Sequence, residues 1–312
     1  MRAAINLMVL AVILSGIGPV LVRDSPVDSA ATAFWRLAIA LPIALILIRR
    51  SFLLPPRAMV WAAFAGLFLA GDLCFWNAAL MRTTILEGTV LVMVYPLIAA
   101  IANYLIFKER ITKRIAIGGL IAFGGLLLMV ADADASSGSS VSGDLMAVAA
   151  AFFYTGSLLI SARLCRIYDT QIVSFWLIFW AAVGAAVVAF SPIAAGALGF
   201  IPIAPDSRAV PTDLRGWAYV IGYAVLTLVS YNLFNRGLKT VPTGLASLMG
   251  YGQPVVATIL GFFILDETPT LDGILGSIVI VIGLVLATRQ PKEVAKENPP
   301  KTPPETPLAP AS

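Results

Sequence analysis

Residues 94–110, VYPLIAAIANYLIFKER, decide how this chain folds, because a similar pattern is written again at 252–268 as GQPVVATILGFFILDET. In each copy a proline, Pro96 or Pro254, lies early in an apolar run, and a glutamate, Glu109 or Glu267, follows thirteen residues later. A proline inside a helix removes one hydrogen bond and displaces the carbonyl four residues earlier. Pro96 and Pro254 are therefore predicted hinges in two related helices.

The composition places the chain in a membrane. Of its 312 residues, 59% are hydrophobic and 12% are charged. A soluble protein of this size needs polar area to cover its surface, so the apolar area is expected to face lipid. The net charge of +4 comes from basic residues in short loops between apolar runs. That pattern is typical of membrane topology and argues against a nucleic-acid partner.

The residue types also restrict the chemistry. Histidine is absent, which removes the commonest general base and the commonest metal ligand. The two cysteines, Cys74 and Cys165, fall in or beside apolar runs far apart in the sequence and are expected to be small buried hydrophobes. We therefore expect no catalytic residues, no metal site and no cofactor.

Ten apolar runs have about the 20 residues that a helix needs to cross the hydrocarbon core. They lie at 4–22, 30–48, 58–80, 85–106, 112–131, 144–163, 170–190, 216–238, 243–265 and 271–288. Basic residues gather in the loops of one side, which places both termini in the cytoplasm. The sequence predicts an all-α, multi-pass protein of a bacterial-type inner membrane with ten transmembrane helices.

A repeat divides these helices into two sets. The same offset of 158 residues brings several polar residues and glycines into line without a gap. The pairs are Asn77 with Asn235, Pro96 with Pro254, Glu109 with Glu267, Gly118 with Gly276 and Gly125 with Gly283. Five helices per copy is an odd number, so the second copy is expected to cross the membrane in the opposite sense. We predict inverted repeats at 1–135 and 136–290, followed by a disordered cytoplasmic tail at 291–312.

The repeated glycines predict a specific contact. Gly118 and Gly125 are seven residues apart on the fifth helix, as are Gly276 and Gly283 on the tenth. Seven residues are about two helical turns, so each pair lies on one face and allows another backbone to approach closely. General packing within a bundle is the alternative to a contact between the fifth and tenth helices.

Two blocks carry a family resemblance. They read AGDLCFWNAALMRTTILEGTVLVMVYPLIAAIANYLIFKERITKRIAIGGLIAFGGLLLMV and YNLFNRGLKTVPTGLASLMGYGQPVVATILGFFILDETPTLDGILGSIVIVIGLVLAT. With them the sequence resembles an EamA-type member of the drug/metabolite transporter superfamily over residues 1 to 290. The resemblance implies ten helices in two inverted units around a central cavity, and export or uptake of a small metabolite. Amino-acid exporters are one branch, while other relatives handle nucleotide-like, vitamin or cationic compounds.

The chain departs from the superfamily at one point. Small multidrug members carry a glutamate in the middle of the first helix, whereas MVLAVILSGIGPVLV, residues 8–22, has no acid. Proton-coupled drug antiport through that carboxylate is therefore not implied for this chain.

Charged residues inside apolar runs are candidates for function, because each costs about 2.5 to 3.5 kcal/mol to insert. Arg36, Asp72 and Glu87 are the three candidates. Arg36 and Asp72 are expected at similar depths, where they either contact the carboxylate and amino groups of a zwitterionic substrate or form a structural ion pair. Glu87, near a helix start, is read first as a satisfied helix terminus and second as a proton carrier.

Polar and aromatic residues complete the predicted site. Tyr95 and Gln253 occupy equivalent positions directly before the repeated prolines, near the middle of the membrane. The full set of predicted substrate-binding residues is Arg36, Asp72, Trp76, Asn77, Tyr95, Tyr231, Asn235, Tyr251 and Gln253.

The expected function is secondary or facilitative transport of a small metabolite, an amino acid or related compound with export favoured, by alternating access. The alternative is a membrane-embedded enzyme acting on a lipid-like substrate. The sequence lacks a phosphate-binding glycine-lysine loop, so direct ATP drive needs a partner subunit, and proton antiport and facilitated diffusion both remain open. The expected partners are the substrate and the lipid bilayer, with the protein active as a monomer.

Overall fold

The computed structural model describes residues 1–48, 53–83, 85–108, 111–130, 140–190, 209–264 and 270–289. Within these ranges every regular element is a helix and no strand occurs. The helices are α1 (Arg2–Ser15), α2 (Gly18–Arg23), α3 (Ser29–Ala38), α4 (Ala40–Leu47), α5 (Pro56–Leu80), α6 (Ile85–Val92), α7 (Tyr95–Phe107), α8 (Lys113–Val130), α9 (Val141–Ile167), α10 (Thr170–Phe190), α12 (Leu214–Leu238), α13 (Thr243–Leu248), η1 (Met249–Tyr251), α14 (Gly252–Ile264) and α15 (Leu271–Thr288). Glu109, Glu267 and the tail at 291–312 lie outside the described residues.

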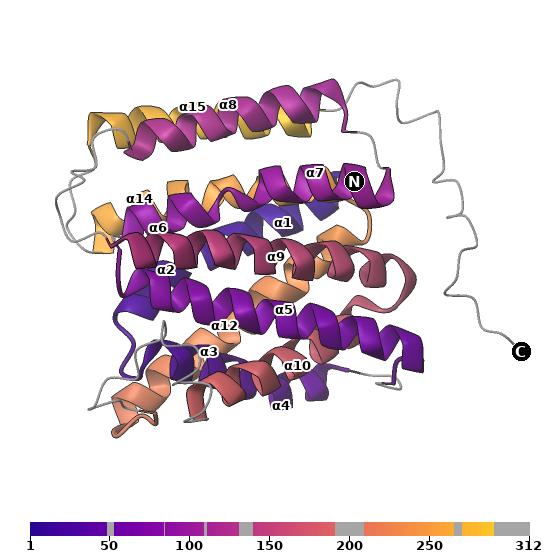
Figure 1. Ribbon diagram of the computed structural model, residues 1–312, viewed down its shortest axis with the longest axis vertical. Helices are drawn as coiled ribbons and strands as arrows, with labels where there is room; N and C mark the ends of the chain where they lie inside the picture. Colours follow the sequence, from indigo (N-terminus) through magenta and orange to yellow (C-terminus); the bar gives the residue numbers. More distant parts are fainter. Residues whose placement is uncertain are drawn as a thin grey trace, which may run out of the picture.

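The helices lie side by side as a bundle (Figure 1). In that view α8 and α15 form one edge, α3, α4 and α10 lie at the other, and α5 and α9 run between them. Within the described part of the chain, eight helical segments are long and apolar enough to cross a membrane. They are Arg2–Val22, Ser29–Leu47, Pro56–Leu80, Gly88–Ile106, Val141–Ile167, Thr170–Phe190, Leu214–Leu238 and Leu271–Thr288.

These eight segments coincide with eight of the ten runs expected from the sequence and confirm an all-helical, multi-pass membrane protein. The other two runs, 112–131 and 243–265, are the helix α8 and the divided segment formed by α13, η1 and α14. Neither is among the eight, so a total of ten membrane-spanning helices stays a prediction.

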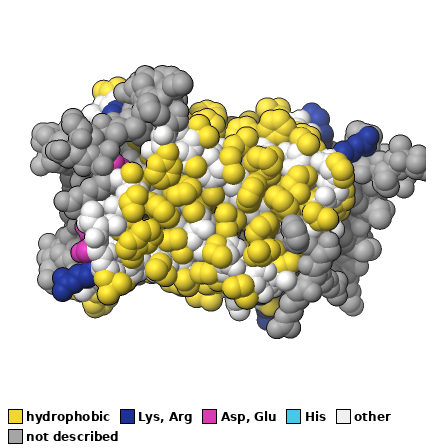
Figure 2. Space-filling view, turned by 90° about the horizontal axis from the view of Figure 1, so that it is seen from below, with side chains coloured by type: hydrophobic (Ala, Val, Ile, Leu, Met, Phe, Trp, Pro, Cys, Tyr) yellow, Lys and Arg dark blue, Asp and Glu magenta, His cyan; other side chains and the backbone are white. Residues whose placement is uncertain are grey.

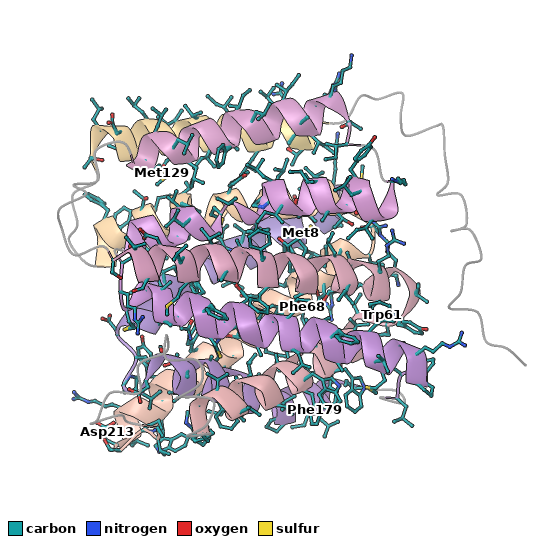
Figure 3. All side chains as sticks on the ribbon, in the orientation of Figure 1. Met8, Trp61, Phe68, Met129, Phe179 and Asp213 are labelled. Atoms are coloured by element: carbon teal, nitrogen blue, oxygen red, sulfur yellow. The ribbon has the colours of Figure 1, made fainter. Side chains whose placement is uncertain are left out.

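The outer surface agrees with a membrane environment. Large apolar side chains point outward, among them Ile46, which is 80% exposed, and Trp61, which is 45% exposed, whereas Met8 is fully buried between helices (Figure 3). Figure 2 shows a broad apolar face, with the described Lys and Arg side chains toward its two ends. An apolar band between charged ends suits a bilayer whose hydrocarbon core is about 30 Å thick.

Prolines explain three interruptions along the chain. Each interrupted helix ends at the fourth residue before a proline, whose ring displaces that residue's carbonyl and whose nitrogen cannot donate to it. The helix ends and their prolines are Ser15 and Pro19, Ala38 and Pro42, and Val92 and Pro96. The sequence predicted single helices at 4–22, 30–48 and 85–106, and the structure divides each of them at this point.

The second copy of the repeated motif is interrupted at the equivalent place. Gly250, four residues before Pro254, lies in the short 3₁₀ turn η1 between α13 and α14. A turn with tighter hydrogen bonding is a common way to pass a position where the α-helical bond is lost. Both repeated prolines therefore stand just after a helix break, at Tyr95–Pro96 and at Gln253–Pro254.

Three helices begin with the same local device. The N-cap side chain accepts a hydrogen bond from the backbone N–H of a glycine three residues later, which satisfies one of the free donors at a helix start. Ser140 accepts from Gly143 at 3.1 Å, Asp213 from Gly216 at 2.8 Å and Thr270 from Gly273 at 3.1 Å. Figure 3 shows Asp213 at the end of the bundle, as expected for a residue that caps a membrane helix.

Helices α8 and α15 pack through their glycines. A Cβ added at Gly118 would lie 2.6 Å from the carbonyl oxygen of Gly283, and one added at Gly125 would lie 2.6 Å from that of Gly276. Such distances leave no room for a side chain, so the two backbones are in direct contact. The predicted contact between these four glycines is confirmed, and its order shows that the two helices run antiparallel.

Candidate functional site

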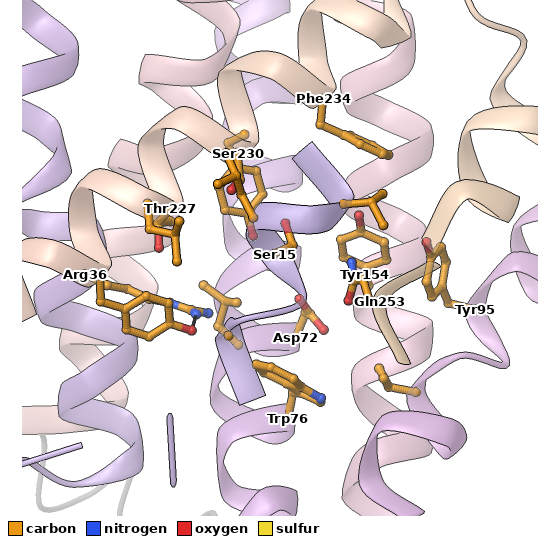
Figure 4. A pocket seen from close by; sticks show the side chains of 18 of the residues that line it. Ser15, Arg36, Asp72, Trp76, Tyr95, Tyr154, Thr227, Ser230, Phe234 and Gln253 are labelled. Carbon is orange, nitrogen blue, oxygen red and sulfur yellow. Dashed lines mark hydrogen bonds between the residues drawn. The ribbon is translucent and has the colours of Figure 1, made fainter. Parts of the chain in front are cut away.

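A cavity of about 120 Å³ lies in the interior of the bundle (Figure 4). Its wall comes from α1, α2, α3, α5, α6, α7, α9, α12 and α14, which are distant from one another in sequence. In the view of Figure 4, Arg36 and Tyr95 lie at opposite sides, with Asp72 and Trp76 between them. Three of the four helix breaks lie at this cavity, since Ser15, Val92 and Gln253 belong to its lining, whereas Ala38 does not.

Six of the nine predicted substrate-binding residues line this cavity. They are Arg36, Asp72, Trp76, Tyr95, Tyr231 and Gln253. The structure thus gathers residues from five helices that the sequence could place only by depth and charge. Their role in substrate binding stays a prediction.

The other three lie away from the cavity lining. The Asn77 amide donates to the carbonyl of Ser29 at 2.9 Å, and the Asn235 amide donates to Ser174 Oγ at 2.8 Å. Tyr251 is fully buried, and its ring centroid lies 6.5 Å from that of Phe123.

The rotation of a helix explains why Asn77 points elsewhere. It follows Asp72 by five residues on α5, which is about 140° around the helix at 100° per residue. Each asparagine instead joins its helix to a neighbour, Asn77 to the start of α3 and Asn235 to α10.

Most of the cavity face of α12 was not predicted from the sequence. Tyr223, Thr227, Ser230, Tyr231 and Phe234 all line the cavity, and only Tyr231 was predicted. Their spacing of four, three, one and three residues follows one face of a helix. The four hydroxyl-bearing residues of this stripe, which are all but Phe234, were the available signal, because polar groups in a membrane helix usually face the protein interior.

Arg36 and Tyr223 are in direct contact at the cavity wall. Arg36 is 4% exposed, its Nη1 donates a hydrogen bond to the Tyr223 hydroxyl, and its Cζ lies 4.9 Å from the centre of the Tyr223 ring. The tyrosine therefore contacts the guanidinium through both its hydroxyl and its ring face, which attracts a cation. Nε and Nη2 of Arg36 have no hydrogen-bond partner in the described part of the chain.

Asp72 is buried close by without joining Arg36. It is 7% exposed and lines the same cavity, yet no ion pair connects it to Arg36 among the described residues. The structural ion pair that the sequence allowed is therefore not formed. An acidic and a basic side chain thus border one cavity without an ion pair between them, and the side chain of Glu87 lies outside the described residues.

Aromatic side chains form the opposite wall. The rings of Tyr95 and Tyr154 meet edge to face, with centroids 4.5 Å apart. The Tyr95 hydroxyl donates to the carbonyl of Ser247 at 2.9 Å, so the first residue of α7 is tied to α13. Gln253, at the position equivalent to Tyr95, also lines the cavity.

No three His, Cys, Asp or Glu side chains come together among the described residues. Cys74 and Cys165 are both free and buried, as the sequence predicted. The cavity lining itself offers charged, hydrogen-bonding and aromatic side chains.

Comparison with known proteins gives one consistent result. The model of the EamA-like transporter family matches residues 2–131 and 141–289. The chain is 26% identical over 239 residues to the uncharacterized transporter YetK of Bacillus subtilis (strain 168). The matched region covers 72% of this chain and 66% of YetK, which is just under two thirds of that relative. It is 24% identical over 293 residues to the uncharacterized transporter YyaM of the same organism, covering 88% of this chain and 89% of YyaM.

A solved crystal structure of a protein shares the fold. It superposes with a TM-score of 0.69 at 20% sequence identity and covers 92% of this chain and 97% of its own. At that identity the likeness concerns the arrangement of the helices.

Proposed function

The chain belongs to the EamA-like transporter family and is a multi-pass membrane transporter, and from that premise we propose that it moves a small amino acid or a related compound, with export favoured. The proposed mechanism is alternating access, in which the cavity opens first to one side of the membrane and then to the other. The proposed location is an inner membrane, with both termini in the cytoplasm and the protein active as a monomer.

The observation that carries the substrate class is an acidic and a basic side chain that line the cavity without pairing with each other. Asp72 and Arg36 are both buried, both line the cavity and do not pair with each other. A charge kept in a membrane interior costs free energy that a partner of opposite sign offsets. A zwitterion brings both partners at once, its amino group for Asp72 and its carboxylate for Arg36.

The size of the cavity supports a small substrate. Its volume is about 120 Å³. A protein cavity of about 150 Å³ accommodates benzene, a molecule of six heavy atoms. A small amino acid is of this size, so the cavity volume agrees with the amino-acid class.

The proposed conformational cycle uses two inverted halves, 1–135 and 136–290, with five helices each. Three observations support it. The helix breaks before Pro96 and Pro254 occur at equivalent positions, α8 and α15 pack antiparallel through equivalent glycines, and the family model matches two successive stretches. Related halves of opposite orientation can exchange roles when the protein opens to the other side.

Counterflow in proteoliposomes tests this function. Liposomes holding the purified protein are loaded with unlabelled amino acids, nucleosides or organic cations, and uptake of the labelled compound is followed against protein-free liposomes. We expect accumulation of small amino acids. A protein that moves none of these solutes and instead modifies a lipid is an enzyme, and that result would overturn the proposal.

A further inference from the structure

Arg36 presents one edge of its guanidinium without a partner. Nη1 is used by the Tyr223 hydroxyl, whereas Nε and Nη2 are buried and have no hydrogen-bond partner in the described residues. These two nitrogens lie on the same edge of the planar group, and their N–H bonds point in parallel. Figure 4 shows the Arg36 side chain reaching from the cavity wall toward the space bordered by Asp72 and Trp76.

A parallel pair of N–H donors matches one kind of acceptor particularly well. A carboxylate has two oxygens in a plane and accepts two parallel hydrogen bonds from a guanidinium. A buried donor of a charged group that lacks an acceptor costs free energy. This edge therefore favours a ligand that accepts hydrogen bonds from both nitrogens at once. A carboxamide or an ester offers a single carbonyl oxygen to the edge and carries no negative charge.

Tyr223 determines which edge is free. Its hydroxyl occupies Nη1, and its ring lies against the guanidinium with Cζ 4.9 Å from the ring centre. Together these contacts fix the plane of the group and direct the Nε and Nη2 edge away from Tyr223. Asp72 does not occupy that edge, because no ion pair joins it to Arg36 among the described side chains.

We infer that Tyr223 is a positioning residue that holds Arg36 so that its Nε–Nη2 edge binds the carboxylate of the transported molecule. Trp76 Nε1 and Ser230 Oγ, which also belong to cavity-lining residues, are likewise buried and have no hydrogen-bond partner in the described chain. This inference rests on the proposed function and adds the chemical rule by which the site selects its substrate.

The test compares each amino acid with its C-terminal amide. Proteoliposomes take up labelled L-alanine, L-serine or L-threonine in counterflow, and unlabelled amino acid or its amide competes from outside. The amide keeps the amino group and nearly the same size but lacks the carboxylate. We expect the wild-type protein to prefer the acid by at least about tenfold, since a lost hydrogen bond to a charged group has this effect or more.

Two variants separate positioning from general structure. Tyr223→Phe keeps the ring but removes the hydroxyl, so KM for the acids should rise and the preference for acid over amide should fall. Arg36→Lys keeps the charge but lacks the paired donors, so the preference should fall further. Tyr219→Phe is the matched control, because Tyr219 lies on the same helix and donates its hydroxyl to the Leu21 carbonyl at 2.7 Å, outside the cavity lining.

The outcomes are distinct. A collapse of the acid preference in Tyr223→Phe, with Tyr219→Phe unchanged, supports the inference. A wild-type protein that moves solutes but accepts amides as well as acids overturns it and leaves the transporter proposal standing. Retention of the full acid preference in Tyr223→Phe overturns the positioning role, and a wild-type protein that moves no solute at all refutes the proposed function and this inference together.

Discussion

The hydroxyl of Tyr95 donates a hydrogen bond to the carbonyl oxygen of Ser247, 2.9 Å away. This bond connects the helix break before Pro96 with the helix break before Pro254. Tyr95 is the first residue of α7, and Ser247 lies in α13 just before the turn η1. The same tyrosine packs directly against Gly250, where a Cβ would overlap its hydroxyl and lie 2.7 Å from its Cζ. The contact therefore depends on a glycine within η1.

Gly250→Ala is predicted to impair transport by displacing Tyr95 from its bond with Ser247. Tyr95→Phe removes the hydroxyl and with it the bond to Ser247, so it should impair transport to a similar extent, and the double variant should lose little more. Counterflow rates of the single and double variants measure this. Gly222→Ala is the control, since a Cβ there meets nothing within 4 Å. Full activity of Gly250→Ala would show that the contact has no part in the cycle.

The prolines are predicted to matter for movement more than for stability. Pro96→Ala and Pro254→Ala allow each break to close into a regular helix, and alanine is the strongest helix former, so the loss of stability should be about 1 kcal/mol or less. Transport should slow in both variants, because a continuous helix lacks the bending point. Initial rates and thermal unfolding in detergent are compared for each variant. Parallel losses of rate and of folded protein would argue against a hinge.

Alanine substitutions at two adjacent glycines on α8 are predicted to have different effects on stability. Gly125→Ala should destabilise the protein by about 1 to 3 kcal/mol, because its Cβ would press on the backbone of α15. Gly124→Ala should be neutral or stabilise by up to about 1 kcal/mol, since its Cβ meets nothing within 4 Å and alanine favours a helix. Thermal unfolding of the two variants measures the difference. Equal effects would contradict direct packing of α8 on α15.

Much of the fold follows from the sequence because a segment that crosses a lipid bilayer must be long, apolar and helical. Long apolar runs mark the helices, and the glycines spaced by seven residues predicted the contact between α8 and α15. The interruptions at Ser15 and Ala38 were missed, although Pro19 and Pro42 stand four residues beyond them. The rule used for the repeated prolines applies to these two in the same way.

The site was predictable only in part. Arg36 and Asp72 were found because a charge in an apolar run is costly and therefore conspicuous. Tyr223 was missed because tyrosine in a membrane protein is commonly an interfacial anchor, and its role depends on a guanidinium 187 positions away in the chain. Asn77 was included on polarity alone, whereas the helical rotation turns it toward Ser29.

The central claim is that the cavity with Asp72 and Arg36 holds the transported molecule, and counterflow by Asp72→Asn tests it most directly. The substitution keeps the size of the side chain and removes the charge that is proposed to meet the substrate's amino group. We predict that wild-type protein accumulates labelled small amino acids and that Asp72→Asn, still folded and present in the membrane at the same level, loses at least about tenfold of that uptake. Unchanged uptake by Asp72→Asn would contradict the account.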